Sequence, residues 1–369
     1  MNRTIVVIVT LLLACAAGAL AADTDPRPSS ELRPDFRVAV LPVDNLTGAG
    51  APVHEIRRSL MRRMGKLGAQ VIDDASLRSS MAKHRIRYTG GVDTKMSRFF
   101  KDELQADAIL VTSLELYMAD AVPKIALTCR LVSTEAVPQV IWIQSVGLTG
   151  EDSPGLLGLG LIGDPVKLRE KAIRTLVSSL KRYLALSRPF RDAGWGFNAF
   201  RPKEVFVAAP LSPAEKKVVA IIPFKNKSTR KSADQIALLH FAEQLWNTDM
   251  VRVVEPGVIR ERMLAMRSIM SDGFSYRDMD LIAGEMGVDV FLSGKVYEYR
   301  DYQFSGTDPV IDFSALAIQH KDRKFIWASN SYNKGDDAVY IFDFGRVTTA
   351  SAMAVKMMQA VVERMLGGA

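Results

Sequence analysis

An internal repeat constrains this chain of 369 residues more than any other feature. Five blocks of sequence recur in the same order, at an offset that changes by only a few residues. The matched blocks are "VAVLPVDNLTG" from Val38 with "VAIIPFKNKST" from Val219, "VIDDASLRSSM" from Val71 with "VVEPGVIRERM" from Val253, "LQADAILVTSLELY" from Leu104 with "MGVDVFLSGKVYEY" from Met286, "PKIALTCRLV" from Pro123 with "PVIDFSALAI" from Pro309, and "IWIQSVGLTGED" from Ile141 with "IWASNSYNKGDD" from Ile326. The chain therefore reads as two tandem copies of one unit.

Each copy alternates β-rich apolar runs with segments of helical spacing. The first strand ends in Pro and Asn, which favour a turn, and a helix follows it. A short strand, two helices, three strands and a closing helix complete the copy. The expected bounds are 38–43 and 218–224 for the first strand, 52–67 and 232–246 for the first helix, and 166–184 and 348–366 for the closing helix. The order β-α-β-α-α-β-β-β-α predicts an α/β fold, an α+β sandwich with two tandem copies of a mixed β-sheet flanked by helices.

The first residues are typical of an exported protein. The apolar run "TIVVIVTLLLACAAGALA" follows Arg3 and precedes the polar "DTDPRPSS", which is the pattern of a signal peptide. Residues 1–21 are removed if cleavage follows Ala21. If the lipoprotein box "LLAC" is used instead, residues 1–14 are removed and Cys15 becomes the lipid attachment site. Both alternatives stand, and residues 22–35 read as a flexible tether.

Two domains and a connector make up the rest of the chain. The first domain spans residues 36–185, the connector 186–216 and the second domain 217–369. The connector is too apolar for a free linker, because it is rich in aromatic residues as well as Pro, Gly and Arg. Its aromatic residues either pack across the two domains or form a contact surface for a partner; they include Trp195, Phe197 and Phe200.

The stretch "GLLGLGLIGDP" from Gly155 contains the spacing G-x-G-x-x-G. A dinucleotide-binding loop follows the first strand of a βαβ unit, whereas this stretch follows the last strand of the first copy. We therefore expect an apolar flap, and Asp164 with Pro165 to start the closing helix. The flap either packs on its own domain or docks on the other copy, a second subunit or a partner. Its apolar residues are Leu156, Leu157, Leu159, Leu161 and Ile162.

Residues of the types that act in catalysis are scattered along the chain and form no recognisable motif. The histidines His54, His84, His240 and His320 lack metal-ligand spacing, and no P-loop or nucleophile motif occurs. Cys129 lies in an alternating strand, where we expect a buried side chain. The sequence therefore predicts no enzyme activity, no catalytic residue, no metal and no cofactor.

Polar residues at two places in each copy are candidate ligand sites. Asn45 and Asn226 follow the first strand of each copy, where α/β sheets bind ligands, but Asn also forms self-bonded turns. The acidic pairs Glu151-Asp152 and Asp336-Asp337 follow the hairpins, as turn residues or as part of a metal-binding turn. We expect turns at all four positions. The net charge of +7 is spread along the chain, so nucleic acid is not expected as a partner.

These blocks support a family resemblance. "RVAVLPVDNLTG", "ADAILVTSLELY" and the hairpin ending in "IWIQS" resemble the exported domains of the curli-secretion lipoprotein CsgG, the TolB amino-terminal domain and the penicillin-binding-protein activator LpoB. The second copy is closer still, with "FLSGKVYEY" and "KFIWASNSYNKGDD". The resemblance covers nearly all of the mature chain. It implies a non-catalytic domain of the bacterial envelope, often anchored by a lipid.

Together these features predict an exported adaptor that acts by protein–protein contact in secretion, envelope assembly or cell-wall synthesis control. Its expected partners are envelope proteins of the secretion, outer-membrane or peptidoglycan-synthesis machinery. The expected location is the periplasm, with membrane contact only through a lipid on Cys15. The alternative is a subunit of an oligomeric outer-membrane-associated assembly that resembles the curli secretion system.

Overall fold

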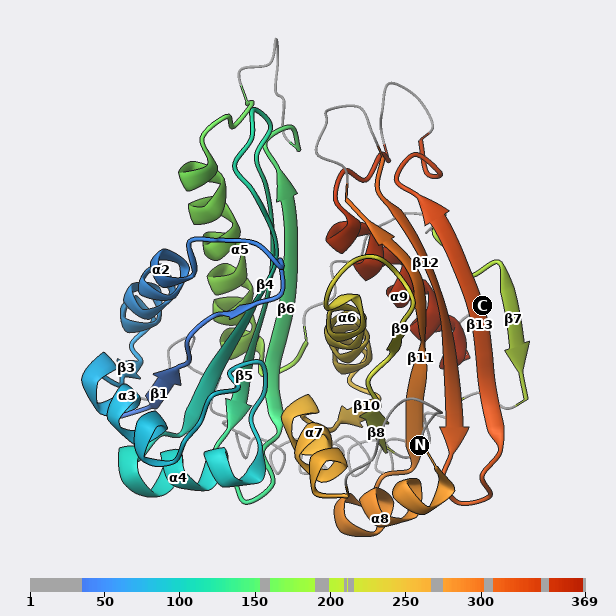
Figure 1. The fold of residues 1–369 in the computed structure, drawn as a ribbon, viewed down its shortest axis with the longest axis horizontal. Helices are drawn as coiled ribbons and strands as arrows, with labels where there is room; N and C mark the ends of the chain where they lie inside the picture. The colour runs from blue at the N-terminus through green and yellow to red at the C-terminus, as the bar shows by residue number, and fades with distance from the viewer. Residues whose placement is uncertain are drawn as a thin grey trace, which may run out of the picture.

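The computed structural model describes residues 35–152, 160–189, 199–208, 211, 216–266, 275–301, 308–339 and 345–367. Within these ranges the chain forms two mixed β-sheets and eight helices (Figure 1), which confirms the predicted fold class. Each half of the chain contributes one sheet. None of the helices in the described ranges is both long and apolar enough to cross a membrane.

The first half builds its elements in the predicted order. They are β1 (Arg37–Val40), β2 (Asp44–Asn45), α2 (Val53–Lys66), β3 (Gln70–Val71), α3 (Asp74–Lys83), α4 (Thr94–Leu104), β4 (Ala108–Met118), β5 (Lys124–Ser133), β6 (Val140–Thr149) and α5 (Pro165–Leu186). Helix α5 begins as expected, with the Asp164 side chain accepting a hydrogen bond from Val166 N at 2.8 Å and Pro165 in the first turn.

The second half repeats this order after one additional strand. Its elements are β7 (Glu204–Val207), β8 (Lys217–Ile221), β9 (Lys225–Asn226), α6 (Ala233–Asn247), β10 (Val251–Val253), α7 (Pro256–Ala265), α8 (Tyr276–Met286), β11 (Val290–Arg300), β12 (Val310–Gln319), β13 (Phe325–Lys334) and α9 (Ala350–Met365). Strand β7 comes from the connector, where we expected no strand.

Corresponding strands take corresponding places in the two sheets. The first sheet has the order β3-β1-β4-β5-β6 with β2 beside β4, and the second has β10-β8-β11-β12-β13-β7 with β9 beside β11. Both long hairpins also carry a register shift at the same point, between Leu114 and Leu116 in β4 and between Val296 and Glu298 in β11. Positions in the two halves can therefore be compared pair by pair.

The elements stack in four layers (Figure 1). Helices α2 and α5 form one outer layer on the first sheet, and α6 and α9 lie between the two sheets. The second sheet is the other outer layer. The apolar cluster around α6 and α9 includes Ile143 of β6, so a continuous core joins the halves. The central helices cover one face of the second sheet, and helices α7 and α8 pack on part of the other face. The remainder of that other face is the candidate site.

Candidate functional site

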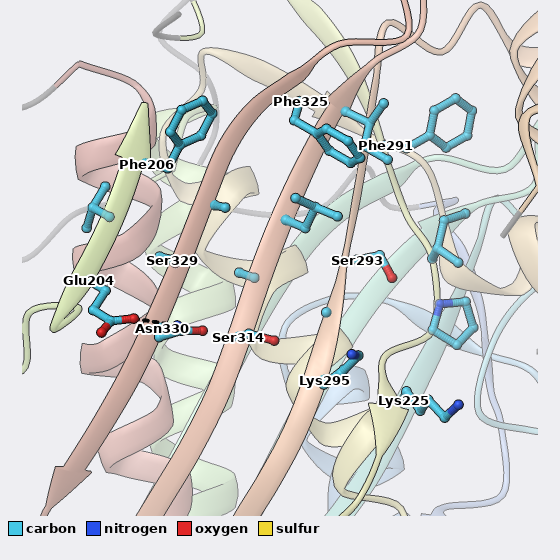
Figure 2. Close-up of a pocket in the computed structure, with 18 of the residues that line it drawn as sticks. Glu204, Phe206, Lys225, Phe291, Ser293, Lys295, Ser314, Phe325, Ser329 and Asn330 are labelled. Carbon is cyan, nitrogen blue, oxygen red and sulfur yellow. Dashed lines mark hydrogen bonds between the residues drawn. The ribbon is translucent and has the colours of Figure 1, made fainter. Parts of the chain in front are cut away.

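The outer face of the second sheet is open over strands β7, β13 and most of β12, whereas helices α7 and α8 pack on it over β8 and over one end of β11 and β12, where Phe291 is buried. We call it the open face. It is hollowed, with a volume of about 970 Å³, and Figure 2 shows its side chains. The residues used below are Glu204, Phe206, Lys225, Phe291, Ser293, Lys295, Ser314, Leu316, Ile318, Phe325, Ala328 and Asn330, which line the hollow, with Tyr297 and Tyr332 beside it.

One row of polar side chains crosses five strands of the open face. The pairing register places Glu204 opposite Asn330, Asn330 opposite Ser314, Ser314 opposite Lys295, and Lys295 opposite Lys225. The Asn330 amide donates to the Glu204 carboxylate at 2.8 Å. The row therefore has a negative charge at the β7 edge and two positive charges at the β11 and β9 edge (Figure 2).

Two apolar rows lie next to the polar row. The first joins Phe206, Ala328 and Leu316, and the second joins Phe325, Ile318 and Phe291. Figure 2 shows the three phenylalanines together toward one end of the strands, with the charged groups toward the other. The open face is thus apolar at one end and polar at the other.

Exposed aromatic side chains gather on this face. Among the residues that the structure describes, the aromatic side chains with large exposure are Phe206, Tyr276, Tyr297, Phe325 and Tyr332, at 41–55% of their full area. Tyr276 and the two phenylalanines line the hollow. Tyr332 pairs with Asp312, two residues along β12 from Ser314, and Tyr297 lies in the bulge of β11. Clustered exposed aromatic area marks a binding surface rather than random surface composition.

The equivalent face of the first sheet is covered. Its position pairs with the open face are Glu115 with Tyr297, Thr128 with Ser314, Arg130 with Leu316, Ser145 with Asn330, and Gly147 with Tyr332. Helices α6 and α9 of the second half pack on this face through β6. The polar side chains among these residues of the first sheet are all buried.

Buried polar contacts hold the covered face to helix α6. His240 Nε2 lies 3.1 Å from a Glu115 oxygen, and Glu243 accepts a hydrogen bond from Ser145 N at 2.8 Å. Thr128 donates to the same Glu115 carboxylate. Burial by itself would lower the pKa of His240, but the Glu115 charge outweighs it and raises that pKa to about 10. The protonated imidazole in turn holds the pKa of Glu115 below its usual value, against the effect of burial.

A second buried ion pair joins β5 to helix α7. Arg130 and Glu255 are both fully buried, with Nη2 and Oε1 3.1 Å apart. Glu255 also accepts from Val92 N at 3.1 Å, and it caps α7 through Gly257 N. Because Leu316 stands at the position of Arg130 in the second sheet, the open face has no corresponding ion pair. The two equivalent faces therefore differ in chemistry: one is charged and covered, the other aromatic and exposed.

Three of the sequence-predicted contact residues lie within the described part of the chain: Leu161, Ile162 and Phe200. Leu161 is 54% exposed, while Ile162 packs against the core of the first half. Phe200 is only 1% exposed and belongs to the core of the second half. Cys15, Leu156, Leu157, Leu159, Trp195 and Phe197 lie outside the described residues.

The polar residues that the sequence offered as candidate ligand sites form hydrogen-bonded turns in the structure. The Asn45 and Asn226 amides donate to the carbonyl oxygens of Ala49 and Arg230, each four residues on. Asp152 and Asp337 accept from the backbone N–H three residues earlier. In the described ranges no group of three His, Cys, Asp or Glu could hold a metal. Cys129 is buried as predicted, and burial raises its pKa to about 12.

Sequence reasoning missed the open face itself. A signal existed in "FIWASNSYNK", where apolar and polar residues alternate and two aromatic side chains fall on the polar side. Phe206 had no comparable signal, because strand β7 is only four residues long.

Parts of this chain are similar in structure to known proteins. The sequence matches no family model and no curated protein. Similar solved structures include a PelC dodecamer from Paraburkholderia phytofirmans, with 17% identity over 44% of this chain and 94% of that chain, and a TM-score of 0.31. Lipoprotein GNA1162 from Neisseria meningitidis has 14% identity over 38% of this chain and 96% of that chain, with a TM-score of 0.29.

The LpoB C-terminal domain from Escherichia coli is also similar in structure, with 13% identity over 32% of this chain and 82% of that chain, and a TM-score of 0.23. Of the three proteins that the sequence resembles, LpoB is represented among these similar structures. The resemblance to CsgG and TolB stays a prediction, as does the division into duplicated domains.

Proposed function

We propose that this protein is a non-catalytic, exported accessory factor of the bacterial envelope that acts by protein–protein contact through the open face. One observation carries the proposal: four of the five exposed aromatic side chains of the described chain lie on strands β7, β11 and β13, and the fifth, Tyr276 of helix α8, lines the same hollow as Phe206 and Phe325. Aromatic residues are enriched at protein interfaces, and large exposed apolar patches on soluble domains mark contact sites.

The envelope location rests on the start of the sequence. Its apolar run and "ALA" end support export, and "LLAC" supports a lipid on Cys15 as the alternative form of the mature chain. The resemblance to envelope domains agrees with this location. Secretion, envelope assembly and cell-wall synthesis control are the processes that the resemblance offers.

Photo-crosslinking in the producing cells tests this function. A photoreactive phenylalanine analogue replaces Tyr332 on the open face or, as a control, Arg62 on the exposed side of α2. We expect crosslinked protein from position 332 and none from position 62. The proposal fails if position 332 gives no crosslinked protein, or if both positions give the same products.

A further inference from the structure

The excess positive charge of this chain lies on the two outer helices of the first half, and we propose that these helices bind a membrane surface of anionic phospholipids. Helices α2 and α5 hold eleven Lys or Arg residues and two Glu residues, a net charge of +9, whereas the whole chain has +7. The charge is therefore concentrated in one layer of the fold (Figure 1), and not spread along the chain as the sequence suggested. The inference goes beyond the proposed function, because the open face lies on the second half.

Helical spacing turns the exposed basic residues of both helices away from the sheet. They are four residues apart on α2 and seven apart on α5: Arg58, Arg62, Lys66, Lys167, Arg174 and Lys181. Residues at these spacings share one side of a helix, and the other side packs on the first sheet through apolar residues such as Leu60 and Leu176. None of the six side chains has a hydrogen bond or ion pair within the part of the chain that the structure describes. We call these six residues the basic platform.

The counterpart helices of the second half show that the fold does not need these charges. Helix α6 has two acidic residues and no Lys or Arg, and α9 has two basic residues and one Glu. The repeat places Leu239 and Glu243 of α6 where α2 has Arg58 and Arg62. Like charges four residues apart also weaken a helix. The basic platform is therefore explained by a partner that it binds, and not by packing on its own sheet.

Apolar side chains at both ends of α5 favour lipid as that partner. Val166 in the first turn of α5 is 49% exposed, and Leu186 at its last residue is 40% exposed. Leu161, shortly before the helix, is 54% exposed. Basic residues beside exposed apolar ones are typical of surfaces that lie on a bilayer, because the charges meet the anionic headgroups while the apolar side chains enter the acyl boundary.

The size and the position of the basic platform suit a membrane surface. Helix α5 has 22 residues and is about 33 Å long, α2 has 14 residues and is about 21 Å long, and both form an outer layer of the molecule (Figure 1). Phe36, directly after the predicted tether, packs on the same core cluster as these helices, so the chain enters the fold on their side of the sheet. A lipid on Cys15 would thus act beside the platform, and a single acyl chain needs a second signal for stable anchoring.

Sedimentation of the purified mature chain, produced without a lipid, with phospholipid vesicles tests the inference. We expect binding to vesicles that contain about one-third phosphatidylglycerol in phosphatidylcholine, and none to pure phosphatidylcholine. Binding to the anionic vesicles should be lost at about 1 M salt, where charges are screened within about 3 Å. Each basic residue near an anionic surface strengthens binding about fivefold, so Arg62→Gln, Arg174→Gln and Lys181→Gln together should weaken it about 100-fold.

A matched control removes the same number of exposed charges from the second half. Lys227→Gln, Arg277→Gln and Lys321→Gln together should leave vesicle binding unchanged. Gln is about as good a helix former as Lys or Arg, so the platform variant should keep its thermal midpoint.

Three results with vesicles overturn the inference: no binding to the anionic vesicles, equal binding to neutral ones, or equal weakening by the two sets of substitutions. A protein crosslinked from position 62 in cells would also overturn it, because the platform would then bind an acidic protein instead of lipid. Crosslinks from position 332 test the open face alone, so either proposal can fail while the other stands.

Discussion

The buried ion pair between Arg130 and Glu255 supports a quantitative prediction about how the two halves are joined. Arg130→Leu introduces the residue that the second half carries at the equivalent position, Leu316. The Glu255 carboxylate would then stay fully buried, with Val92 N and Gly257 N as hydrogen-bond donors but without its positive partner. Removing one partner of a buried ion pair lowers the free energy of unfolding by about 3–5 kcal/mol.

A second variant separates loss of charge from loss of packing. Glu255→Gln in the Arg130→Leu background removes the uncompensated charge but keeps an oxygen acceptor for Val92 N. We expect it to recover more than half of the lost stability, because replacing both partners costs far less than removing one.

Urea unfolding followed by tryptophan fluorescence measures the effect. The ring of Trp246 in α6 lies tilted against that of Tyr183 in α5, with 5.3 Å between ring centres, so its emission reports on contact between the halves. The free energy of unfolding falls with urea concentration by about 3 kcal/mol per M for a chain of this size. A loss of about 4 kcal/mol in that free energy therefore lowers the urea midpoint of unfolding by about 1.3 M. The reasoning is refuted if Arg130→Leu shifts the midpoint by less than about 0.3 M, or if the double variant is no more stable than the single one.

Two further predictions concern the same contact between the halves. The folded-state pKa of His240 is about 10, above its ordinary 6.5, so its stabilising contribution is complete below pH 6.5 and is lost as the pH rises through 10. The free energy of unfolding should fall between pH 6.5 and 10, and less steeply in His240→Gln; equal slopes would contradict this. Gly257→Ala would place a Cβ about 2.4 Å from Val92 N and should cost about 1–3 kcal/mol. The control Gly65→Ala, in α2 with open space around it, should gain about 0.5–1 kcal/mol, and thermal midpoints that move in the same direction would contradict the steric argument.

Much of the fold follows from local pattern and repetition. The repeat predicts that Val38 and Val219 start equivalent strands, and both pair in parallel with the strands that the blocks predict. The turns at Asn45 and Asn226 follow from local hydrogen bonding alone. Such features need no knowledge of distant parts of the chain.

The contact between the halves could not be predicted in the same way. Arg130 and Glu115 stand in strands whose other residues predict burial, and nothing local says that Glu255 and His240 will lie against them across more than 100 residues of chain. One sequence signal did exist in α6, whose "IALLHFAEQLW" is apolar nearly all round, whereas α2 has a single apolar stripe. A helix apolar on every side is buried on every side, which predicts a second sheet against it.

The layer of α6 and α9 shared by both sheets bears on the order in which the protein is made. Helix α9 is the last helix of the chain, yet its Thr349 and Ala352 lie against Gly147 of the first sheet. The first half therefore emerges from synthesis with one face of its sheet still bare, and helices α6 and α9 of the second half cover that face later. A chain that stops short of residue 350 would lose part of the cover of a sheet completed some 200 residues earlier, so the packing of the first half depends on the last helix that the structure describes.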